Sequence, residues 1–344
     1  MIPSTTLADL RKVGIVVPVH NEEEVLLVFH QLLCDSIQGL PYQFTIYYIN
    51  DGSTDRTAEI LQRLTSQDER VTAIELSRNF GHQAALTAGL DAAKGDYVIT
   101  MDGDGQHPPA LIPAMLDLAA AGYDLVLTQR DDPFSGSVFK RQTSSLFYRL
   151  INRVGDTQVL PGGADFRLIT RTAADGLKQM REYHRFLRGM VAWMGFRTVI
   201  LPYSPPERLA GKSKYTLRKM LRLAANAIFS FSLVPLYVGL SLGALMLFLA
   251  LVEMVYVLSF WISGNQQSLA PGWSSLMFVL LVVGGLLMIL LGFIGVYVGF
   301  IFQEVKGRPI YLVRQVIHPA NTIDTATPIM AEPPGPPNSP LPRI

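Results

Sequence analysis

The chain has 344 residues, of which 49% are hydrophobic and 17% are charged, so it is long enough for a complete α/β domain with about a hundred residues to spare. Its formal net charge of +1 favours neither a nucleic-acid-binding protein nor an enzyme that attracts acidic substrates by overall charge, and we expect no nucleic-acid partner. The single cysteine, Cys34, cannot form an internal disulfide. We expect it to be a small, buried, apolar residue in a reducing compartment rather than a nucleophile.

Four short runs of β-branched and aromatic residues are each followed by a polar cluster and then by a helical pattern. The expected strands lie at residues 13–19, 44–49, 71–76 and 97–101, with helices that end near residues 37, 64 and 93. Ser53 or Thr54 is placed to cap the second helix. Strands that alternate with helices are typical of a parallel, doubly wound sheet, and right-handed crossovers bring the carboxyl ends of all four strands to one edge. The predicted fold class is therefore α/β, and we expect ligands to bind at that edge.

The remainder of the first domain is less regular. Further strands are expected at residues 124–128, 162–169 and 197–202, with a helix at about 138–154. A basic, amphipathic segment follows at residues 208–228.

The strand at residues 97–101 ends in Asp-Gly-Asp-Gly-Gln, where glycines and the two prolines that follow stop it. Asp102 and Asp104 are one residue apart and repel each other unless a cation neutralises them. Together with the amide of Gln106 they form an all-oxygen set that suits Mg²⁺ or Mn²⁺. The alternative is a solvated acidic turn. An EF-hand is excluded because its glycine and its bidentate glutamate are both missing.

The other strand ends carry groups that a nucleotide requires. These are a hydrogen-bonding carboxylate for the base, backbone N–H groups and polar side chains for the ribose, and a cation for the diphosphate. An acidic turn at one strand end also occurs without a ligand, but here four sequential strand ends supply the set. The candidate nucleotide-binding residues are Pro18, Asn21, Glu22, Asp51, Ser53, Arg78 and Gly81. Dehydrogenase and P-loop ATPase functions are not favoured, since the glycine patterns of both are absent or incomplete.

Two long uncharged runs follow, at residues 232–252 and 274–303, and each can cross a hydrocarbon layer about 30 Å thick. We expect transmembrane helices at residues 229–261 and 274–302, joined by a short external loop at 262–273. That loop has no Lys or Arg, whereas basic residues flank the helices on the other side, so the positive-inside rule places both termini in the cytosol. Residues 1–11 lack the hydrophobic core of a signal peptide. We therefore expect a multi-pass protein of the plasma (inner) membrane with a cytosolic catalytic domain at 1–207, a cytosolic juxtamembrane segment at 303–318 and a disordered, Pro-rich tail at 319–344.

Six motifs stand in the order found in one known family. They are Val17-Pro-Val-His-Asn-Glu-Glu23, Asn50-Asp-Gly-Ser-Thr-Asp55, Ser77-Arg-Asn-Phe-Gly81, Asp102-Gly-Asp-Gly-Gln-His-Pro-Pro109, Asp165-Phe-Arg-Leu168 and Gly211-Lys-Ser-Lys-Tyr215. From about residue 13 to 314 the chain resembles the family 2 glycosyltransferases of the GT-A fold, and specifically the polyprenyl-phosphate glycosyltransferases similar to dolichyl-phosphate mannosyltransferase. The resemblance implies a Rossmann-like, mostly parallel GT-A domain followed by two transmembrane helices, as in the two-span bacterial form.

The resemblance also implies roles for the matching positions. Pro18, Glu22 and Asp51 would hold the nucleoside, and Asp102, Asp104 and Gln106 would hold the metal and the donor diphosphate. The acceptor phosphate would meet Arg130, Lys140 and Ser144, with Arg208 and Lys212 assisting near the donor or acceptor phosphates. Relatives of this form assemble as homo-oligomers, often tetramers. Two positions depart from the pattern, since Asn50 replaces a common aspartate and Lys140 replaces an arginine found in some relatives.

Two other groups of residues stay open. His20, His82 and His107 have no spacing suited to a zinc site, so we expect pocket hydrogen bonds or surface positions for them. Arg185 and Arg188 line the acceptor groove in one interpretation and solvate a helix in the other.

A lipid phosphate is the acceptor that the residues themselves favour, because the basic residues at 208–222 adjoin the first predicted span and can reach an anionic headgroup. A phosphate monoester has a second pKa near ~6 and is already a nucleophilic anion at neutral pH, so no general base is required. Asp104 is the first candidate if one is needed. We expect inverting transfer of one sugar from a UDP- or GDP-sugar to polyprenyl (undecaprenyl) phosphate, with Mg²⁺ or Mn²⁺ stabilising the departing nucleoside diphosphate. The alternatives are a processive polysaccharide synthase and a non-enzymatic, sugar-nucleotide-binding membrane scaffold.

Overall fold

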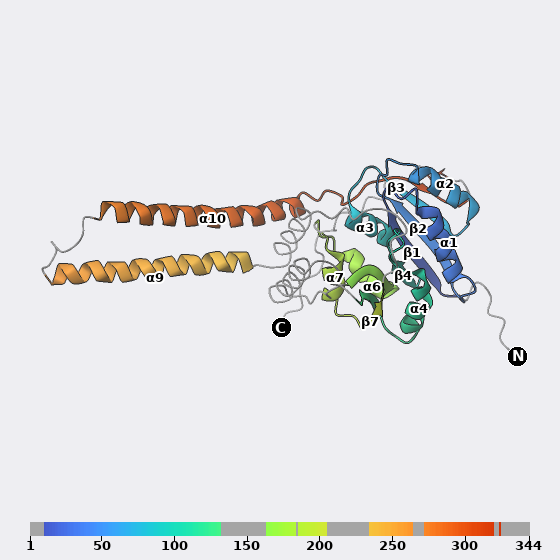
Figure 1. Ribbon diagram of the computed structural model, residues 1–344, viewed down its shortest axis with the longest axis horizontal. Coiled ribbons are helices and arrows are strands. Elements are labelled where there is room, and N and C mark those ends of the chain that lie inside the picture. The colour runs from blue at the N-terminus through green and yellow to red at the C-terminus, as the bar shows by residue number, and fades with distance from the viewer. Residues whose placement is uncertain are drawn as a thin grey trace, which may run out of the picture. The chain divides into compact units, whose positions relative to one another are not determined.

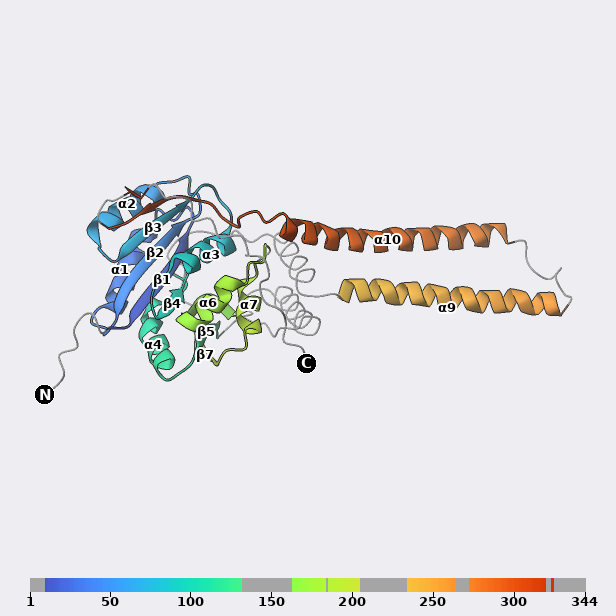
Figure 2. The same ribbon diagram turned by 180° about the vertical axis from the view of Figure 1, so that it is seen from behind.

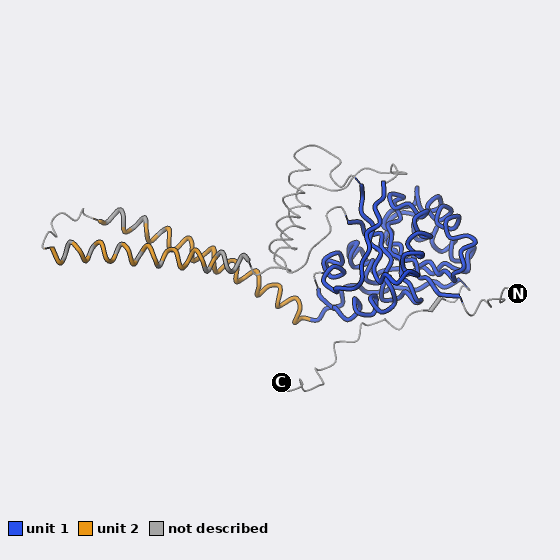
Figure 3. The backbone as a smooth tube through the Cα atoms, turned by 90° about the horizontal axis from the view of Figure 1, so that it is seen from below, with its two compact units in different colours: residues 1–153, 157–217, 307–344 blue, residues 154–156, 218–306 orange. Residues whose placement is uncertain are grey.

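The computed structural model describes residues 10–131, 163–183, 185–204, 234–263, 272–319 and 323–324. The chain divides into two compact units (Figure 3). Unit 1 contains residues 1–153, 157–217 and 307–344, and unit 2 contains residues 154–156 and 218–306. Four predicted phosphate-binding residues, Lys140, Ser144, Arg208 and Lys212, lie outside the described residues. The same is true of the expected helix at 138–154, of the basic segment at 208–228 and of most of the tail.

Unit 1 is built on one sheet with the strand order β7-β5-β6-β4-β1-β2-β3-β8-β9 (Figures 1 and 2). The strands are β1 (Lys12–Val19), β2 (Gln43–Asn50), β3 (Val71–Leu76), β4 (Tyr97–Thr100), β5 (Leu125–Arg130), β6 (Gly163–Thr170), β7 (Thr198–Tyr203), β8 (Val313–Ile317) and β9 (Ile323–Asp324). Strands β3, β2, β1 and β4 are parallel neighbours, which confirms the predicted α/β fold class with its parallel core. Because β6 and β8 run in the opposite direction, the sheet is mostly but not wholly parallel.

Helices cover both faces of the sheet, and each face has its own apolar core (Figure 1). On one face lie α1 (Leu26–Ile37), α2 (Thr57–Gln67) and α4 (Ile112–Ala120), which follows the short 3₁₀ helix η2 (Pro109–Leu111). On the other face lie α3 (His82–Ala92), α6 (Arg171–Gln179) and α7 (Leu187–Trp193). Every residue of β1 after Lys12 is buried, because this strand has helices on both of its faces. This double burial explains the continuous apolar run in the sequence.

The sequence does not indicate two of the strand arrangements, and one expected helix cap is absent. The antiparallel strand β6 lies between β4 and β5, so β5 does not extend the parallel core directly. Strand β8 follows the long apolar helices and pairs with β3, and β9 pairs with β8 inside the expected disordered tail. Neither Ser53 nor Thr54 caps α2, which begins at Thr57 without a side-chain cap. The first two features depend on pairing between residues far apart in the chain, which local sequence patterns do not encode.

Cys34 packs against the apolar core but is half-buried rather than fully buried as predicted, and its thiol also has polar neighbours. Its half-buried Sγ lies 3.1 Å from Nη2 of Arg70, 3.5 Å from Nε2 of His30 and 3.6 Å from Oδ2 of Asp68. Burial raises the pKa of Cys34 to about 11, more than the Arg70 charge lowers it. The thiol is therefore protonated at neutral pH, which fits the expectation that it is not a nucleophile.

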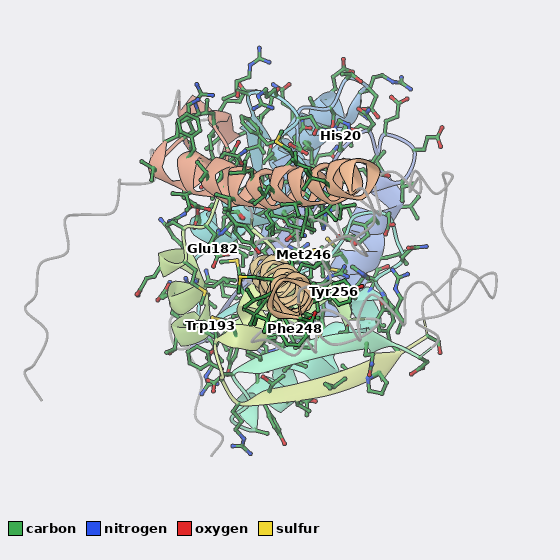
Figure 4. The ribbon with its side chains drawn as sticks, turned by 90° about the vertical axis from the view of Figure 1, so that its left-hand side faces the viewer. His20, Glu182, Trp193, Met246, Phe248 and Tyr256 are labelled. Atoms are coloured by element: carbon green, nitrogen blue, oxygen red, sulfur yellow. The ribbon has the colours of Figure 1, made fainter. Side chains whose placement is uncertain are left out.

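Unit 2 is a hairpin of two long helices, α9 (Val234–Ile262) and α10 (Trp273–Val305) (Figure 3). The helices approach closely at Gly239, where an added Cβ would lie 2.2 Å from Cδ2 of Leu290. Phe248 and Tyr256 project from α9, and more than half of each is exposed (Figure 4). Within the described part of the chain, one helix is long and apolar enough to cross a membrane, with its span at Val282–Val305 of α10. Membrane insertion of both helices stays a prediction.

Candidate active site

The predicted ligand-binding edge lies where the parallel strands end. Strand β1 is flanked by β2 on one side and by β4 on the other, so the strand order reverses at β1. In open α/β sheets, the loops at such a switch point leave a crevice for ligands. The ends of β1 to β4 and the loops that follow them carry the predicted donor-side and metal-binding residues, namely Pro18, Asn21, Glu22, Asp51, Ser53, Arg78, Gly81, Asp102, Asp104 and Gln106.

Hydrogen bonds join the loop after β1 to the loop after β2. Asn21 has a positive φ of 55°, which asparagine tolerates, and its N–H donates to Oγ of Ser53 at 3.1 Å. Its Oδ1 accepts from the N–H of Thr54 at 2.8 Å. The N–H of Glu22 donates to Oγ1 of Thr57 at 3.0 Å. These bonds fix the backbone of the predicted nucleotide-binding loops, and they use the side chains of Asn21 and Ser53 within the protein.

Asp51 connects the loop after β2 to the loop after β3. Its side chain is buried, its Oδ1 accepts from the N–H of Phe80 at 2.7 Å, and its Oδ2 accepts from the N–H of Gly81 at 2.9 Å. The next residue, Gly52, has a φ of 60°, and a Cβ there would lie 2.5 Å from the backbone carbon of Arg78. The two loops therefore pack backbone against backbone. Each oxygen of a carboxylate can accept a second hydrogen bond, so these contacts orient Asp51 without exhausting its acceptors.

The loop at residues 102–107 is folded by its own hydrogen bonds. The N–H of Asp102 donates to Nδ1 of His107 at 2.8 Å, and the N–H of Gln106 donates to Oδ1 of Asp104 at 3.0 Å. Gly105 has a φ of 78°, a conformation that glycine adopts without strain. Asp102, Asp104 and Gln106 are each half-buried. The loop thus presents two carboxylates and an amide at the carboxyl edge of the sheet.

His107 is the buried centre of this loop. Only 1% of it is exposed, and its ring stacks on Phe166 with the ring centroids 5.4 Å apart. Burial lowers the pKa of His107 and outweighs the opposite effect of Asp102, Asp104 and Asp165. In the neutral ring Nδ1 accepts the N–H of Asp102, so the proton is on Nε2, which lies 3.6 Å from Oδ2 of Asp102.

The carboxylate of Asp102 has an unsatisfied oxygen. Its Oδ1 is buried and has no hydrogen-bond partner among the described residues, and Nε2 of His82 lies 3.5 Å from it. Leaving a buried polar group unsatisfied costs about 1–3 kcal/mol, and more for a charged group, so a ligand at this oxygen is expected. Carboxylate and amide oxygens are the ligands that Mg²⁺ and Mn²⁺ prefer. The side chains of Asp102, Asp104 and Gln106 therefore fit a divalent cation.

A cluster of charged side chains from β6 and α7 lies next to Asp102. The buried carboxylate of Asp165 accepts hydrogen bonds from Arg167 and from Nη2 of Arg188, the latter at 2.9 Å. Nε2 of His82 lies 3.3 Å from Asp165, so His82 stands between Asp165 and Asp102. Burial opposes the ionisation of Asp165, but Arg188, Arg167 and His82 outweigh it and hold the pKa of Asp165 well below its usual range. The pKa of His82 is raised, since Asp165 and Asp102 outweigh the effect of burial.

The sequence does not predict that these residues lie together. No role follows from it for Asp165, His82 could lie in a pocket or at the surface, and Arg188 could line the acceptor groove or face solvent. A usable signal is the pair of opposite charges, Asp165 and Arg167, inside an otherwise apolar strand, because buried charges require partners. Arg185 does not join the group and instead donates to the backbone oxygen of Leu177 at 2.8 Å.

Arg130 connects the predicted acceptor side to the predicted metal-binding loop. Its Nη2 donates to Oε1 of Gln106 at 3.3 Å, and its Nε donates to the hydroxyl of Tyr203 at 3.3 Å. Among the predicted phosphate-binding residues, Arg130 is the one within the described ranges, and it lies beside the loop at residues 102–107.

Known proteins resemble the chain over most of its length. Residues 14–177 match Glycosyl transferase family 2. The uncharacterized glycosyltransferase YkcC of Bacillus subtilis is 40% identical over 302 residues, which cover 88% of this chain and 93% of the relative. The SfII prophage-derived bactoprenol glucosyl transferase of Shigella flexneri is 37% identical over 308 residues, which cover 88% of this chain and 98% of the relative. Among solved structures, mannosyl-3-phosphoglycerate synthase from Rubrobacter xylanophilus is 17% identical with a TM-score of 0.45, covering 63% of this chain and 72% of that one, a likeness too distant to add to the fold described above.

Proposed function

The chain belongs to glycosyl transferase family 2, and we propose that it transfers one sugar from a nucleotide sugar to the phosphate of a polyprenyl phosphate lipid. The observation that carries this proposal is the likeness to a bactoprenol glucosyl transferase along nearly its whole length, because bactoprenol is a polyprenol. The edge of the sheet where the loops after β1 to β4 lie supports the same function, since it combines the candidate nucleotide-binding residues with the candidate cation ligands.

The donor nucleotide would lie against the loops after β1, β2 and β3. Asp51, oriented by two backbone N–H groups, is our candidate for the hydrogen bond to the base, with Pro18 and Glu22 beside the nucleoside. The exposed guanidinium of Arg78 lies over the ring of Phe80 at 4.0 Å, from where it can turn towards a diphosphate. Asn21, Ser53 and Gly81 would shape these loops rather than select the base.

Asp102, Asp104 and Gln106 would hold Mg²⁺ or Mn²⁺. When bound, such a cation supplies positive charge for the departing nucleoside diphosphate. Hydrogen bonds within the chain orient these ligands. His107 accepts the backbone N–H of Asp102, Asp104 accepts the N–H of Gln106, and Arg130 donates to the amide oxygen of Gln106. The unsatisfied Oδ1 of Asp102 is the feature that favours a cation at this position.

The acceptor phosphate would attack the anomeric carbon of the sugar directly. A bond forms between a phosphate oxygen and that carbon while the bond to the donor diphosphate breaks, which inverts the configuration. The phosphate monoester is an anion at neutral pH, so this step needs no general base, and Asp104 stays the candidate if one is used. Arg130, Lys140, Ser144, Arg208 and Lys212 would bind the acceptor phosphate through charge-assisted hydrogen bonds.

We also propose that α9 and α10 anchor the enzyme at the cytosolic face of the plasma membrane, where the lipid phosphate is available. The apolar length of α10 supports this placement. A homo-oligomer, such as a tetramer, is part of the same proposal.

The test uses the full-length protein in lipid nanodiscs with undecaprenyl phosphate, Mg²⁺ or Mn²⁺ and a panel of labelled UDP- and GDP-sugars that begins with glucose. We expect a labelled lipid that forms only with a divalent cation. Asp104→Ala should abolish its formation while the protein still inserts and folds. Asp117→Ala is the matched control because Asp117 is exposed on α4, and it should retain activity.

The outcomes separate the candidate functions. Full activity of Asp104→Ala would remove the metal assignment. A product that grows beyond one sugar would favour a processive synthase, and nucleotide-sugar binding without turnover would favour a scaffold. If no donor in the panel gives a labelled lipid, the proposed transfer is wrong.

A further inference from the structure

Three potential metal ligands form a cluster outside the residues assigned to the active site. They are His30, Cys34 and Asp68. His30 and Cys34 are four residues apart in α1 and so lie on the same face of that helix. Asp68 follows α2 directly, in the turn that leads to β3.

The three ligand atoms form a nearly equilateral triangle. Nε2 of His30 lies 3.5 Å from Sγ of Cys34 and 3.6 Å from Oδ2 of Asp68, and Sγ lies 3.6 Å from the same Oδ2. In a tetrahedral zinc site with bonds of about 2.0–2.3 Å to nitrogen, sulfur and oxygen, the ligand atoms are about 3.4–3.6 Å apart. The side chains therefore need almost no movement to bind such an ion.

The surroundings orient the histidine for this role. The hydroxyl of the buried Tyr48 lies 3.1 Å from Nδ1 of His30 and can accept a hydrogen bond from Nδ1–H, which leaves the lone pair of Nε2 directed at the cluster. Metal-binding histidines are commonly held by a hydrogen bond of this kind from the other ring nitrogen. Only 12% of the His30 side chain and 14% of the Asp68 side chain are exposed, so the cluster is largely shielded from water.

Arg70 is the competitor for this position. Its Nη2 lies 2.7 Å from Oδ2 of Asp68 and 3.1 Å from Sγ of Cys34, so the guanidinium now supplies the positive charge beside the carboxylate. The Arg70 side chain is 40% exposed and can turn outward into solvent. A divalent ion and the guanidinium would therefore exclude each other, and removing Arg70 should strengthen metal binding.

We propose that His30, Cys34 and Asp68 bind a transition-metal ion of the zinc type, with water as the fourth ligand and with Arg70 displaced. The combination of imidazole, thiolate and carboxylate suits Zn²⁺ or Co²⁺ rather than Mg²⁺. The bound ion would link α1 to the turn after α2. It would thereby hold together the two helices that follow the loops after β1 and β2. This proposal does not depend on the proposed sugar transfer.

Cobalt tests the proposal directly, because a cobalt–thiolate bond absorbs strongly in the near ultraviolet and Cys34 is the only cysteine of the chain. The full-length protein is titrated with Co²⁺ under reducing conditions in the presence of excess Mg²⁺, which fills the oxygen-rich site at Asp102 and Asp104. We expect the band to saturate at one cobalt per chain and to disappear when Zn²⁺ is added. If the wild-type protein shows no thiolate band, the proposal is overturned.

Variants distinguish a built site from a thiol that binds cobalt by itself. Tyr48→Phe should weaken cobalt binding by about 10–100-fold, the usual effect of losing the hydrogen-bond partner of a metal-bound histidine. Asp68→Asn should weaken it at least as much, and Arg70→Gln should strengthen it. Asp35→Asn is the matched control, since Asp35 is exposed on α1 and bonded to Gln31, and it should leave the affinity unchanged. Should Asp68→Asn fail to fold, Arg70→Gln still decides, because an unchanged or weaker affinity in that variant contradicts the proposed competition.

Discussion

Among single residues, His107 determines the shape of the loop that carries Asp102 and Asp104. Its Nδ1 is the acceptor for the N–H of Asp102, and its ring is fixed by the stack on Phe166. From the sequence, His107 is a histidine close to Asp102 and Asp104 with no predicted structural role. Its role depends on the stack on Phe166 of β6, a strand that lies about sixty residues further along the chain.

We expect His107→Phe to preserve the fold but to weaken metal-dependent activity. Phenylalanine keeps the stack on Phe166, yet it leaves the N–H of Asp102 without an acceptor at a cost of about 1–3 kcal/mol. The concentration of Mg²⁺ or Mn²⁺ that gives half-maximal activity should rise, and thermal unfolding serves to check the fold. A metal requirement equal to that of the wild type would refute the positioning role of His107.

Cys34 permits a second prediction at this scale. Burial raises its pKa from 9.0 to about 11, so below pH 9 the thiolate fraction is about a hundredfold smaller than for an unshifted thiol. In the presence of a chelator, we expect slow alkylation of the folded protein at pH 8 and fast alkylation after unfolding, measured by mass spectrometry. Because the folded pKa is raised, the stability that comes from the neutral thiol is complete below pH 9 and is lost as the pH rises towards 11. Equal alkylation rates in both states would contradict this shift.

At the scale of elements, the contact between the loops after β2 and β3 decides how the predicted nucleotide-binding edge is assembled. The apolar runs and the glycines that end them locate these strands, so the sequence predicts which loops meet. It does not predict that Asp51 accepts two N–H groups from the next loop or that Gly52 touches the backbone of Arg78. Those contacts depend on the parallel pairing of β2 and β3, which places residues 25 positions apart, such as Asn50 and Glu75, beside each other.

We expect Gly52→Ala to reduce donor binding more than acceptor binding. The added Cβ would lie 2.5 Å from the backbone carbon of Arg78 at a position with positive φ, so the loop after β3 must move. Steady-state kinetics should show a higher KM for the nucleotide sugar and a nearly unchanged KM for the lipid. Gly39→Ala is the control, because Gly39 also has a positive φ of 75° but no atom within 4 Å of an added Cβ. Equal effects of the two substitutions would mean that backbone strain alone, and not the loop contact, is responsible.

At the scale of the whole molecule, the path of the chain constrains its topology. Unit 1 includes residues on both sides of the α9–α10 hairpin, and β8 pairs with β3 after the hairpin has ended. Since one folded sheet lies on one side of a membrane, the segments before α9 and after α10 must be on the same side. If the hairpin inserts, it therefore crosses the membrane an even number of times.

This constraint can be tested with single cysteines in a Cys34→Ser background. Gln62→Cys is exposed on α2, and Gln266→Cys lies in the predicted external loop. A membrane-impermeant maleimide applied to intact cells should label Gln266→Cys but not Gln62→Cys, and both should react after permeabilisation. Labelling of Gln62→Cys in intact cells would contradict a cytosolic catalytic domain.

The sequence by itself determined the features that depend on local patterns. It located the four parallel β-α units, the loops that end them and the two long apolar stretches, because strand periodicity, turn residues and uncharged length are written in consecutive residues. Only the tertiary structure decided the features that join distant residues. These are the insertion of β6 beside β4, the addition of β8 to β3, the placement of His82 between Asp102 and Asp165, and the approach of Asp68 to the His30–Cys34 pair of α1. Each of these contacts forms when separate elements pack against one another, and no short stretch of the chain contains both partners.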